Sequence, residues 1–341
     1  MNTEQRKPKS RRFRKVLTIA LAGISVAAVI GASANVWLTK QERAKYPPPG
    51  EMIDIGGRSL HLYCTGERRP DQPTVLLETG AYGYSLNWFR IQPVLENSFR
   101  VCSYDRAGFG WSDSLTGRRS VMQEADDAIR MLKASEEQGP FILVGMSYGG
   151  VLVRQFFEEA PEMTAGIVFV DPASLEARRS VPTAFKIARQ VAMAQRYGMA
   201  FLSNFGVWRA IEIPVSLPDD LDPALREQHL TITNWTRYHN TVADATVQMF
   251  RDMVETDLMI GQDFGDLPIT ILSANDKPGT ERIIEKHRHH SGLASRSTNF
   301  RHHIIDGAAH GSFLRTKEYA ATVIDAVIEL DAVIASSAST E

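Results

Sequence analysis

Residues 141–150 read Phe-Ile-Leu-Val-Gly-Met-Ser-Tyr-Gly-Gly. The apolar run at 141–146 predicts a buried strand, and the residues that follow the serine have helical spacing. A Gly-x-Ser-x-Gly turn between a strand and a helix is typical of a nucleophilic serine held in a strained backbone conformation. Gly145 and Gly149 leave room where side chains would clash with neighbouring elements. We therefore take Ser147 as the candidate nucleophile; an ordinary glycine turn with an inert serine is the alternative.

A base and an acid are expected further along the chain. His310 follows the last predicted strand, and small residues around it would let its imidazole reach Ser147. Asp276 follows the strand before that one. The order serine, aspartate, histidine is one of the known orders of a catalytic triad. We predict the triad Ser147, Asp276 and His310, with Asp171, which also ends a strand, as the rival acid; Asp171 could instead only form the turn before Pro172.

Two backbone N–H groups are needed to bind the oxygen that becomes anionic in the reaction. The residue after the nucleophile, Tyr148, is expected to supply one of them. The loop at 78–84 follows a predicted strand, and in it Gly80 lets the backbone turn so that Ala81 can donate the other. An ordinary glycine turn is again the alternative reading of this loop.

The rest of the body alternates short apolar runs with helical stretches. Strands separated by helices predict an α/β fold with a mostly parallel central sheet and helices on both faces. The predicted strands are 52–55, 60–64, 74–78, 100–104, 141–146, 167–170, 269–273 and 301–305, and the predicted helices are 121–134, 149–159 and 318–333.

A long strand-free segment interrupts this alternation. Residues at about 175–264 carry helical patterns rich in methionine and aromatic residues. Such a segment is too long to be a loop in a compact domain, so we predict an inserted helical cap within a domain at 51–335. Its apolar residues could line an acyl pocket or form the core of the cap itself.

The charge of the chain is unevenly distributed. The formal net charge is −2, but residues 1–50 carry +8 and the remainder therefore −10. The acidic body does not suggest nucleic-acid binding. Residues 1–15 form a basic tail, and 16–38 carry no charge. A helix of that length spans a hydrocarbon core of roughly 30 Å.

The basic tail is expected to stay in the cytoplasm, which places the catalytic domain on the extracytoplasmic side of a single-pass protein. Trp37 fits an anchor at the membrane interface. Ala32-Ser33-Ala34 is also a signal-peptidase site, so export after cleavage near Ala34 is the alternative to a signal anchor. Residues 39–50, with three consecutive prolines, predict an extended linker.

Residues 104–113 read Tyr-Asp-Arg-Ala-Gly-Phe-Gly-Trp-Ser-Asp. Together with the turn at Ser147 and the order of the triad, this stretch resembles the α/β-hydrolase superfamily over about 51–335. The resemblance implies that 104–113 braces the loops beside the site. Many members have His where this chain has Met146. The pairing of Ser147 with Tyr148 and two glycines is also seen in some serine exopeptidases of this fold.

The resemblance also bears on the two cysteines. In that fold, the strands that carry Cys64 and Cys102 are antiparallel neighbours, so a disulfide can form if the Cα atoms come within roughly 7 Å. Export past a membrane would favour the bond. Two buried, reduced thiols are the alternative.

These features predict a serine hydrolase that acts through an acyl-enzyme on a small-molecule carboxylic ester with an apolar acyl group. The alternatives are a serine exopeptidase or amidase, a thioesterase, or a catalytically silent ligand-binding module of the same fold. No cofactor or metal is expected. A sequence cluster of histidines could suggest a metal site, but no carboxylate or cysteine completes a ligand set. Its members are His287, His289, His290, His302 and His303.

Overall fold

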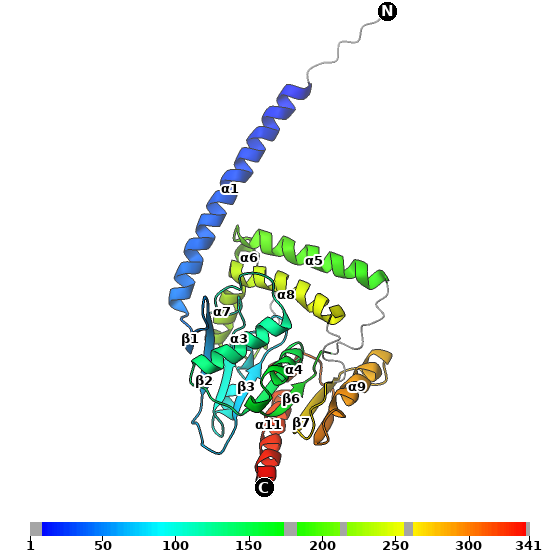
Figure 1. The fold of residues 1–341 in the computed structure, drawn as a ribbon. Helices are drawn as coiled ribbons and strands as arrows, with labels where there is room; N and C mark the ends of the chain where they lie inside the picture. The colour runs from blue at the N-terminus through cyan, green and yellow to red at the C-terminus, as the bar shows by residue number, and fades with distance from the viewer. Residues whose placement is uncertain (1–8, 174–182, 212–216, 256–261, 339–341) are drawn as a thin grey trace, which may run out of the picture.

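The computed structural model describes residues 9–173, 183–211, 217–255 and 262–338. Figure 1 shows a long N-terminal helix that extends away from a domain in which helices cover a sheet. The first strand begins at Glu51, one residue before the predicted strand at 52–55.

The described residues form one sheet of eight strands in the order β1-β2-β4-β3-β5-β6-β7-β8. β2 is antiparallel to both of its neighbours, and all other neighbouring strands are parallel. The predicted mostly parallel sheet is therefore confirmed, with strand ends that differ by at most three residues. The strands are β1 (Glu51–Asp54), β2 (Ser59–Thr65), β3 (Thr74–Glu78), β4 (Val101–Tyr104), β5 (Phe141–Met146), β6 (Thr164–Val170), β7 (Ile269–Asn275) and β8 (Phe300–Asp306).

Helices on both faces explain why the central strands are apolar along their whole length. Along β5, Leu143 enters one core cluster, while Ile142 and Val144 enter the other. α3, α4 and α9 pack in the first cluster, and α2, α10 and α11 pack in the second. The bounds are α2 (Gln92–Leu95), α3 (Val121–Ala134), α4 (Gly149–Glu159), α9 (Glu281–Ala294), α10 (Ser312–Arg315) and α11 (Lys317–Ala338), with short 3₁₀ helices η1 (Ser85–Trp88) and η2 (Pro161–Met163).

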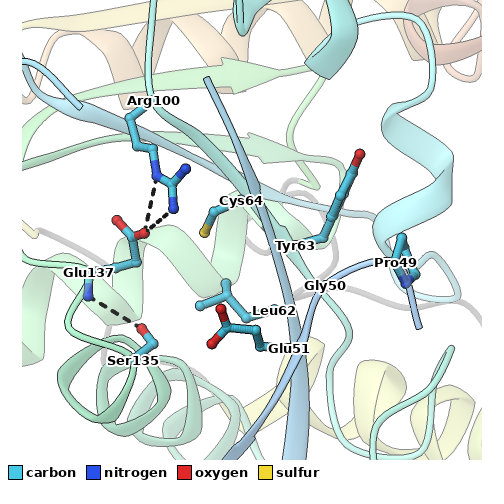
Figure 2. Close-up of a pocket in the computed structure, with 9 residues that line it drawn as sticks. All are labelled: Pro49, Gly50, Glu51, Leu62, Tyr63, Cys64, Arg100, Ser135 and Glu137. Carbon is cyan, nitrogen blue, oxygen red and sulfur yellow. Dashed lines mark hydrogen bonds and ion pairs between the residues drawn. The ribbon is translucent and has the colours of Figure 1, made fainter. Parts of the chain in front are cut away.

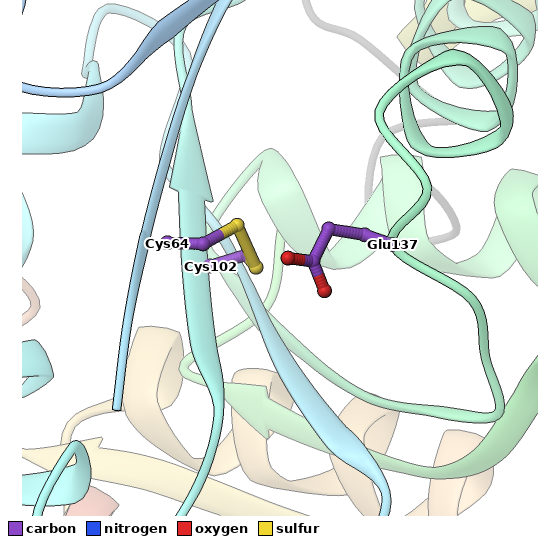
Figure 3. Close-up of side chains that lie close together, drawn as sticks. All are labelled: Cys64, Cys102 and Glu137. Atoms are coloured by element: carbon purple, nitrogen blue, oxygen red, sulfur yellow. A yellow bond between two sulfur atoms is a disulfide. The ribbon is translucent and has the colours of Figure 1, made fainter. Parts of the chain in front are cut away.

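A disulfide joins the two antiparallel strands β2 and β4. Cys64 lies directly opposite Cys102 in the register of these strands, and their sulfur atoms are bonded (Figure 3). The sequence left a disulfide and two free thiols as alternatives, and the register of the strands decides between them.

The helical cap lies between β6 and β7. Its described helices are α5 (Thr183–Ser203), α6 (Val207–Ala210), α7 (Pro223–Thr233) and α8 (Thr236–Glu255). Trp235 is 1% exposed and packs with Phe109 and Trp111 from the loop after β4. Part of the aromatic content of the cap is therefore buried between the cap and the loop after β4, a role that neither reading of the sequence gave it.

The N-terminal helix α1 (Lys9–Lys45) includes the uncharged stretch at 16–38. By length and composition, it is the one helix of the described residues that could cross a membrane. The predicted linker at 39–50 is partly wrong, because α1 continues through Lys45 and only 46–50 are irregular. Glu42 explains the difference: it accepts a hydrogen bond from Trp235 Nε1 at 3.0 Å and pairs with Arg209, which holds this turn against the cap.

Candidate active site

Ser147 occupies a tight turn between β5 and α4. Its φ is +56°, a conformation that residues with a side chain rarely adopt, as the sequence pattern predicts. A Cβ at Gly145 would lie 2.7 Å from the Gly149 carbonyl oxygen, and one at Gly149 would lie 2.5 Å from the Glu78 carbonyl oxygen. Both positions therefore require glycine, and the turn brings Ser147 to the carboxyl end of β5.

A continuous chain of hydrogen bonds starts at this serine. Ser147 Oγ lies 2.9 Å from His310 Nε2, and His310 Nδ1 lies 2.6 Å from Asp171 Oδ2. Ser147 follows β5, Asp171 follows β6 and His310 lies in the loop after β8. The three side chains thus meet at the carboxyl edge of the sheet, where ligands bind in open parallel sheets.

The prediction that Asp276 contacts the histidine is wrong. His310 contacts Asp171, the rival acid, while Asp276 lies at the surface with its carboxylate 3.6 Å from Arg282. β7 runs two residues longer than the predicted 269–273, so Asp276 directly follows it. Because β7 extends beyond the end of β6, Asp276 lies outward past the site.

Asp171 is held by several groups besides the histidine. Its backbone has φ +43°, and its Oδ1 accepts hydrogen bonds from the Ala274 N–H at 2.9 Å and from Lys286 Nζ at 2.8 Å. Burial raises the pKa of Asp171, but the hydrogen bonds and charges of His310 and Lys286 outweigh burial and hold the pKa well below its usual range. The carboxylate is therefore ionised at neutral pH.

The predicted oxyanion loop lies against the nucleophile. The position of a Cβ built on Gly80 is 3.5 Å from Ser147 Cβ, so the backbone of the loop passes beside the serine. Ala81 and Tyr148, the two expected N–H donors, pack in one small apolar cluster with Met249 of the cap. The structure therefore places both predicted donors close to Ser147: Tyr148 is the next residue in the chain, and Ala81 follows Gly80 in the loop that passes the serine.

Arg106 braces this loop, in agreement with the role that the resemblance implies for residues 104–113. Its guanidinium donates to the Gly80 carbonyl oxygen at 2.6 Å and lies 3.2 Å from the Glu78 carboxylate. Burial raises the pKa of Glu78 to about 7, and the charge of Arg106 opposes that rise. The sequence pattern indicated a bracing role for residues 104–113, but it did not predict the buried ion pair between Arg106 and Glu78 behind the oxyanion loop.

Two other groups of potential ligand side chains lie away from Ser147: part of the predicted histidine cluster, and a group around the disulfide. His290 and His302 both contact the Ser273 hydroxyl, at 2.6 and 2.7 Å, so these two members of the histidine cluster hold β7, β8 and α9 together. Cys64, Cys102 and Glu137 come close enough to hold a metal ion (Figure 3), but the disulfide removes both thiolates.

A pocket of about 230 Å³ lies beside the disulfide, with Arg100 paired to Glu137 at its wall (Figure 2). It is lined by residues of β1, β2 and the loop after α3, and by none of the three hydrogen-bonded residues at the sheet edge. It is therefore separate from the candidate active site.

Comparisons with known proteins agree with this architecture. A protein family described as alpha/beta hydrolase fold matches residues 73–200, a range that includes Ser147 and Asp171 but ends before His310. A thermophilic esterase from Thermogutta terrifontis superposes with a TM-score of 0.58 at 20% identity, covering 82% of this chain and 98% of that one. At this identity, the superposition is evidence of a shared fold only.

Curated relatives match over shorter segments. The "Probable transporter efuK" of Hormonema carpetanum is 36% identical over 128 residues, which are 36% of this chain and 18% of that protein. An "AB hydrolase superfamily protein" of Gibberella zeae is 31% identical over 120 residues, 33% of this chain and 37% of that protein. The match thus spans well under half the length of either relative.

Proposed function

We propose that this chain, a member of the α/β-hydrolase superfamily, is a serine hydrolase that works through an acyl-enzyme. The observation that carries the proposal is the unbroken contact from Ser147 through His310 to Asp171. A strained serine with a histidine in hydrogen-bond reach, itself oriented by a carboxylate, is the arrangement that activates a hydroxyl as a nucleophile.

In the first half of the reaction, Ser147 Oγ forms a bond to the carbonyl carbon of the substrate. Its proton passes to His310 Nε2, which lies 2.9 Å away. The bond from that carbon to the leaving oxygen then breaks, and the leaving alcohol takes the proton from His310. A water molecule repeats the sequence on the acyl-enzyme, which releases the acid and restores Ser147.

The surrounding residues stabilise the charges that develop. Asp171 holds the imidazole in the tautomer that accepts the serine proton and stabilises the imidazolium that forms. The backbone N–H groups of Ala81 and Tyr148 are the proposed donors to the oxyanion. Ala81 follows Gly80, whose carbonyl oxygen Arg106 holds, and Tyr148 lies at the start of α4. Loss of one such donor costs on the order of 3 kcal/mol in related sites.

A small-molecule carboxylic ester with an apolar acyl group is the proposed substrate class. Met249 of α8 packs against the buried cluster that contains Tyr148, the residue after the nucleophile, so an apolar part of the cap lies near the proposed site. The esterase from Thermogutta terrifontis shares the fold. An amide, a peptide or a thioester would follow the same chemical path and remains the alternative substrate.

Anchoring by α1 is the second part of the proposal. The helix carries a basic segment followed by the uncharged stretch at 16–38, and the disulfide fits an oxidising extracytoplasmic compartment. Asn35, the residue after the alternative cleavage site, is 4% exposed. N-terminal sequencing of the membrane-extracted protein tests this part, since a mature chain that starts at residue 35 would contradict an uncleaved anchor.

Labelling with a fluorophosphonate probe tests the enzymatic part. The full-length wild type should react covalently, and Ser147→Ala should not, with Ser114→Ala as a matched control that retains labelling. Folded wild type that does not react would favour a ligand-binding module without catalysis. A panel of p-nitrophenyl esters, aminoacyl nitroanilides and acyl thioesters then separates the substrate classes.

A further inference from the structure

The cap helix α5 has an apolar face that points away from the domain. Large apolar side chains along it are well exposed: Ile187 is 61% exposed, Val191 62% and Phe201 63%. Tyr197 and Leu202 add to the same side. Isolated exposed apolar residues are normal on a protein surface, but a row of them along one helix marks an interaction site.

Charge is missing from this face in the part of α5 whose exposure the structure describes, 187–203. Its exposed positions hold only apolar residues, glutamine, tyrosine and glycine. The two arginines in this part are not among the exposed residues, and the guanidinium of Arg196 lies 5.5 Å from the ring centre of Tyr82, toward the domain. A helix that faces water normally carries charged residues on its outer side, so the composition of this face is unusual for a surface in contact with water.

The end of α5 meets α1 inside the uncharged stretch. A Cβ at Gly31 would lie 2.7 Å from the Phe205 carbonyl oxygen, which follows α5 by two residues. Asn35 donates to the carbonyl oxygen of Ser203, the last residue of α5, at 3.1 Å, and to Thr236 Oγ1 at 2.9 Å. Both Gly31 and Asn35 lie within 16–38, the segment proposed to span the membrane.

Helix length then fixes the depth of the cap. On the N-terminal side of the contact at Gly31, only residues 16–30 of the uncharged stretch are free of the domain. At 1.5 Å per residue, they cover roughly 22 Å. The hydrocarbon core is roughly 30 Å thick. If α1 spans the bilayer, the free part is too short to cross the hydrocarbon core by itself. The boundary of the membrane must therefore lie beyond Gly31 along α1, where the end of α5 contacts this helix.

We propose that the outer face of α5, defined by Ile187, Val191, Tyr197, Phe201 and Leu202, lies in the surface of the same bilayer that α1 crosses. Figure 1 shows α5 on the side of the domain from which the free part of α1 extends, with its axis running across that of α1. Such an orientation suits an interfacial helix, with its apolar face in the boundary between headgroups and acyl chains. The inference rests on the proposed anchoring by α1 and is independent of the hydrolase activity.

Site-specific fluorescence quenching tests the contact. The two cysteines of the chain are joined in a disulfide, so one added cysteine accepts a single environment-sensitive dye. Val191→Cys and Phe201→Cys report on the outer face of α5, Val26→Cys on the span, and Ile328→Cys on α11, a helix that lies on the side of the domain away from the free part of α1 (Figure 1). Each full-length variant is placed in phosphatidylcholine vesicles that contain a minority of phosphatidylglycerol, with nitroxide-labelled lipid added.

Nitroxide near the headgroups should quench dyes at residues 191 and 201 several-fold more than the dye at 328, and nitroxide deep in the acyl chains should quench the dye at 26 most. Quenching at 191 and 201 that equals the quenching at 328, while residue 26 is quenched, would overturn the inference and leave the anchor intact. No quenching at 26 would refute the anchor and the inference together. If the dyes at 191 and 201 are shielded from water only at high protein concentration, and in the absence of lipid, the face contacts a second copy of the chain. That result would also overturn the inference. Probe labelling of Ser147 reports separately on the hydrolase.

Discussion

The ends of β6 and β7 differ sharply, although the two strands are neighbours, parallel, and each directly followed by an aspartate. Asp171 after β6 is 2% exposed and contacts the histidine of the site. Asp276 after β7 lies at the surface, and its described partner is the exposed Arg282. Equivalent positions in the sequence pattern have therefore become a buried, ionised group of the site and an ordinary surface residue.

Strand register accounts for the difference. Val170, the last residue of β6, pairs with Leu272, so β7 continues through three more residues, Ser273–Asn275, before it ends. At about 3.3 Å per residue, Asp276 lies roughly 10 Å farther along the strand direction than Asp171. Which aspartate reaches the histidine is thus decided by how far each strand extends, and not by the residue type or by its place after a strand.

Replacing each aspartate by asparagine gives the largest expected contrast. Asp171→Asn should lower kcat/KM on a reactive p-nitrophenyl ester by about 10³–10⁴-fold, because an amide neither stabilises the imidazolium nor favours the correct tautomer. Asp276→Asn should leave kcat/KM unchanged. Steady-state kinetics on the full-length proteins in the same detergent measure both values.

Circular dichroism serves as the control for folding of the two asparagine variants. A loss confined to Asp276→Asn would return the role of the acid to that residue. Equal activity in both variants would mean that neither carboxylate supports the histidine.

Local sequence patterns were sufficient for much of the fold and for two of the three central residues. The apolar run before Ser147 and the glycines beside it predict the strand, the turn and the helix, because each depends on neighbours in the chain. His310 could be found from the small residues around it after the last strand. The loop at Ala81 could be placed because it follows a strand that must lie next to β5 in this fold.

Contacts set by register or by distant partners could not be predicted in the same way. Asp171 and Asp276 have the same local signature, and nothing in the sequence gives the offset between β6 and β7. The pairing of Cys64 with Cys102 depended likewise on register. The helical turn at Glu42 forms against Trp235 and Arg209, which lie far along the chain, so composition alone suggested an extended linker there.

Two cations one helical turn apart on α9 allow a finer test of the same contrast. Lys286 pairs with buried Asp171 at 2.8 Å, and Arg282 pairs with Asp276 at 3.6 Å. Lys286→Met should lower the free energy of unfolding by about 1–3 kcal/mol, because a buried carboxylate loses a charged partner. Arg282→Met should change it by less than about 0.5 kcal/mol, since exposed ion pairs contribute little.

Denaturant unfolding of the full-length variants at pH 7 measures the two changes. The pKa of Asp171 should also rise in Lys286→Met, because one of the groups that lowers it is gone. The stability that this low pKa contributes is present above the pKa of an unfolded aspartate, about 3.9, and is lost as the pH falls below it. Equal losses in the methionine variants would mean that burial does not distinguish the two pairs.

The smallest expected effect concerns His290, which connects the two strand ends. One ring nitrogen lies 2.6 Å from the Ser273 hydroxyl of β7, and the other 3.0 Å from the carbonyl oxygen of Pro172, the residue after Asp171. Burial lowers the pKa of His290 from 6.5 to about 4. Above pH 6.5 the ring is neutral in both states, and as the pH falls toward 4 the unfolded chain binds a proton that the folded protein does not.

The free energy of unfolding should therefore fall between pH 6.5 and 4, with His290 contributing at most about 1.4 kcal/mol per pH unit. His290→Gln should make this decline shallower without removing it, because burial also lowers the pKa of His229 and of His239 to about 4. Denaturant unfolding at a series of pH values compares the slopes, so a variant that is less stable at every pH still answers the question. An unchanged slope would mean that His290 takes up its proton in the folded protein, and that the connection between the ends of β6 and β7 does not depend on a neutral imidazole.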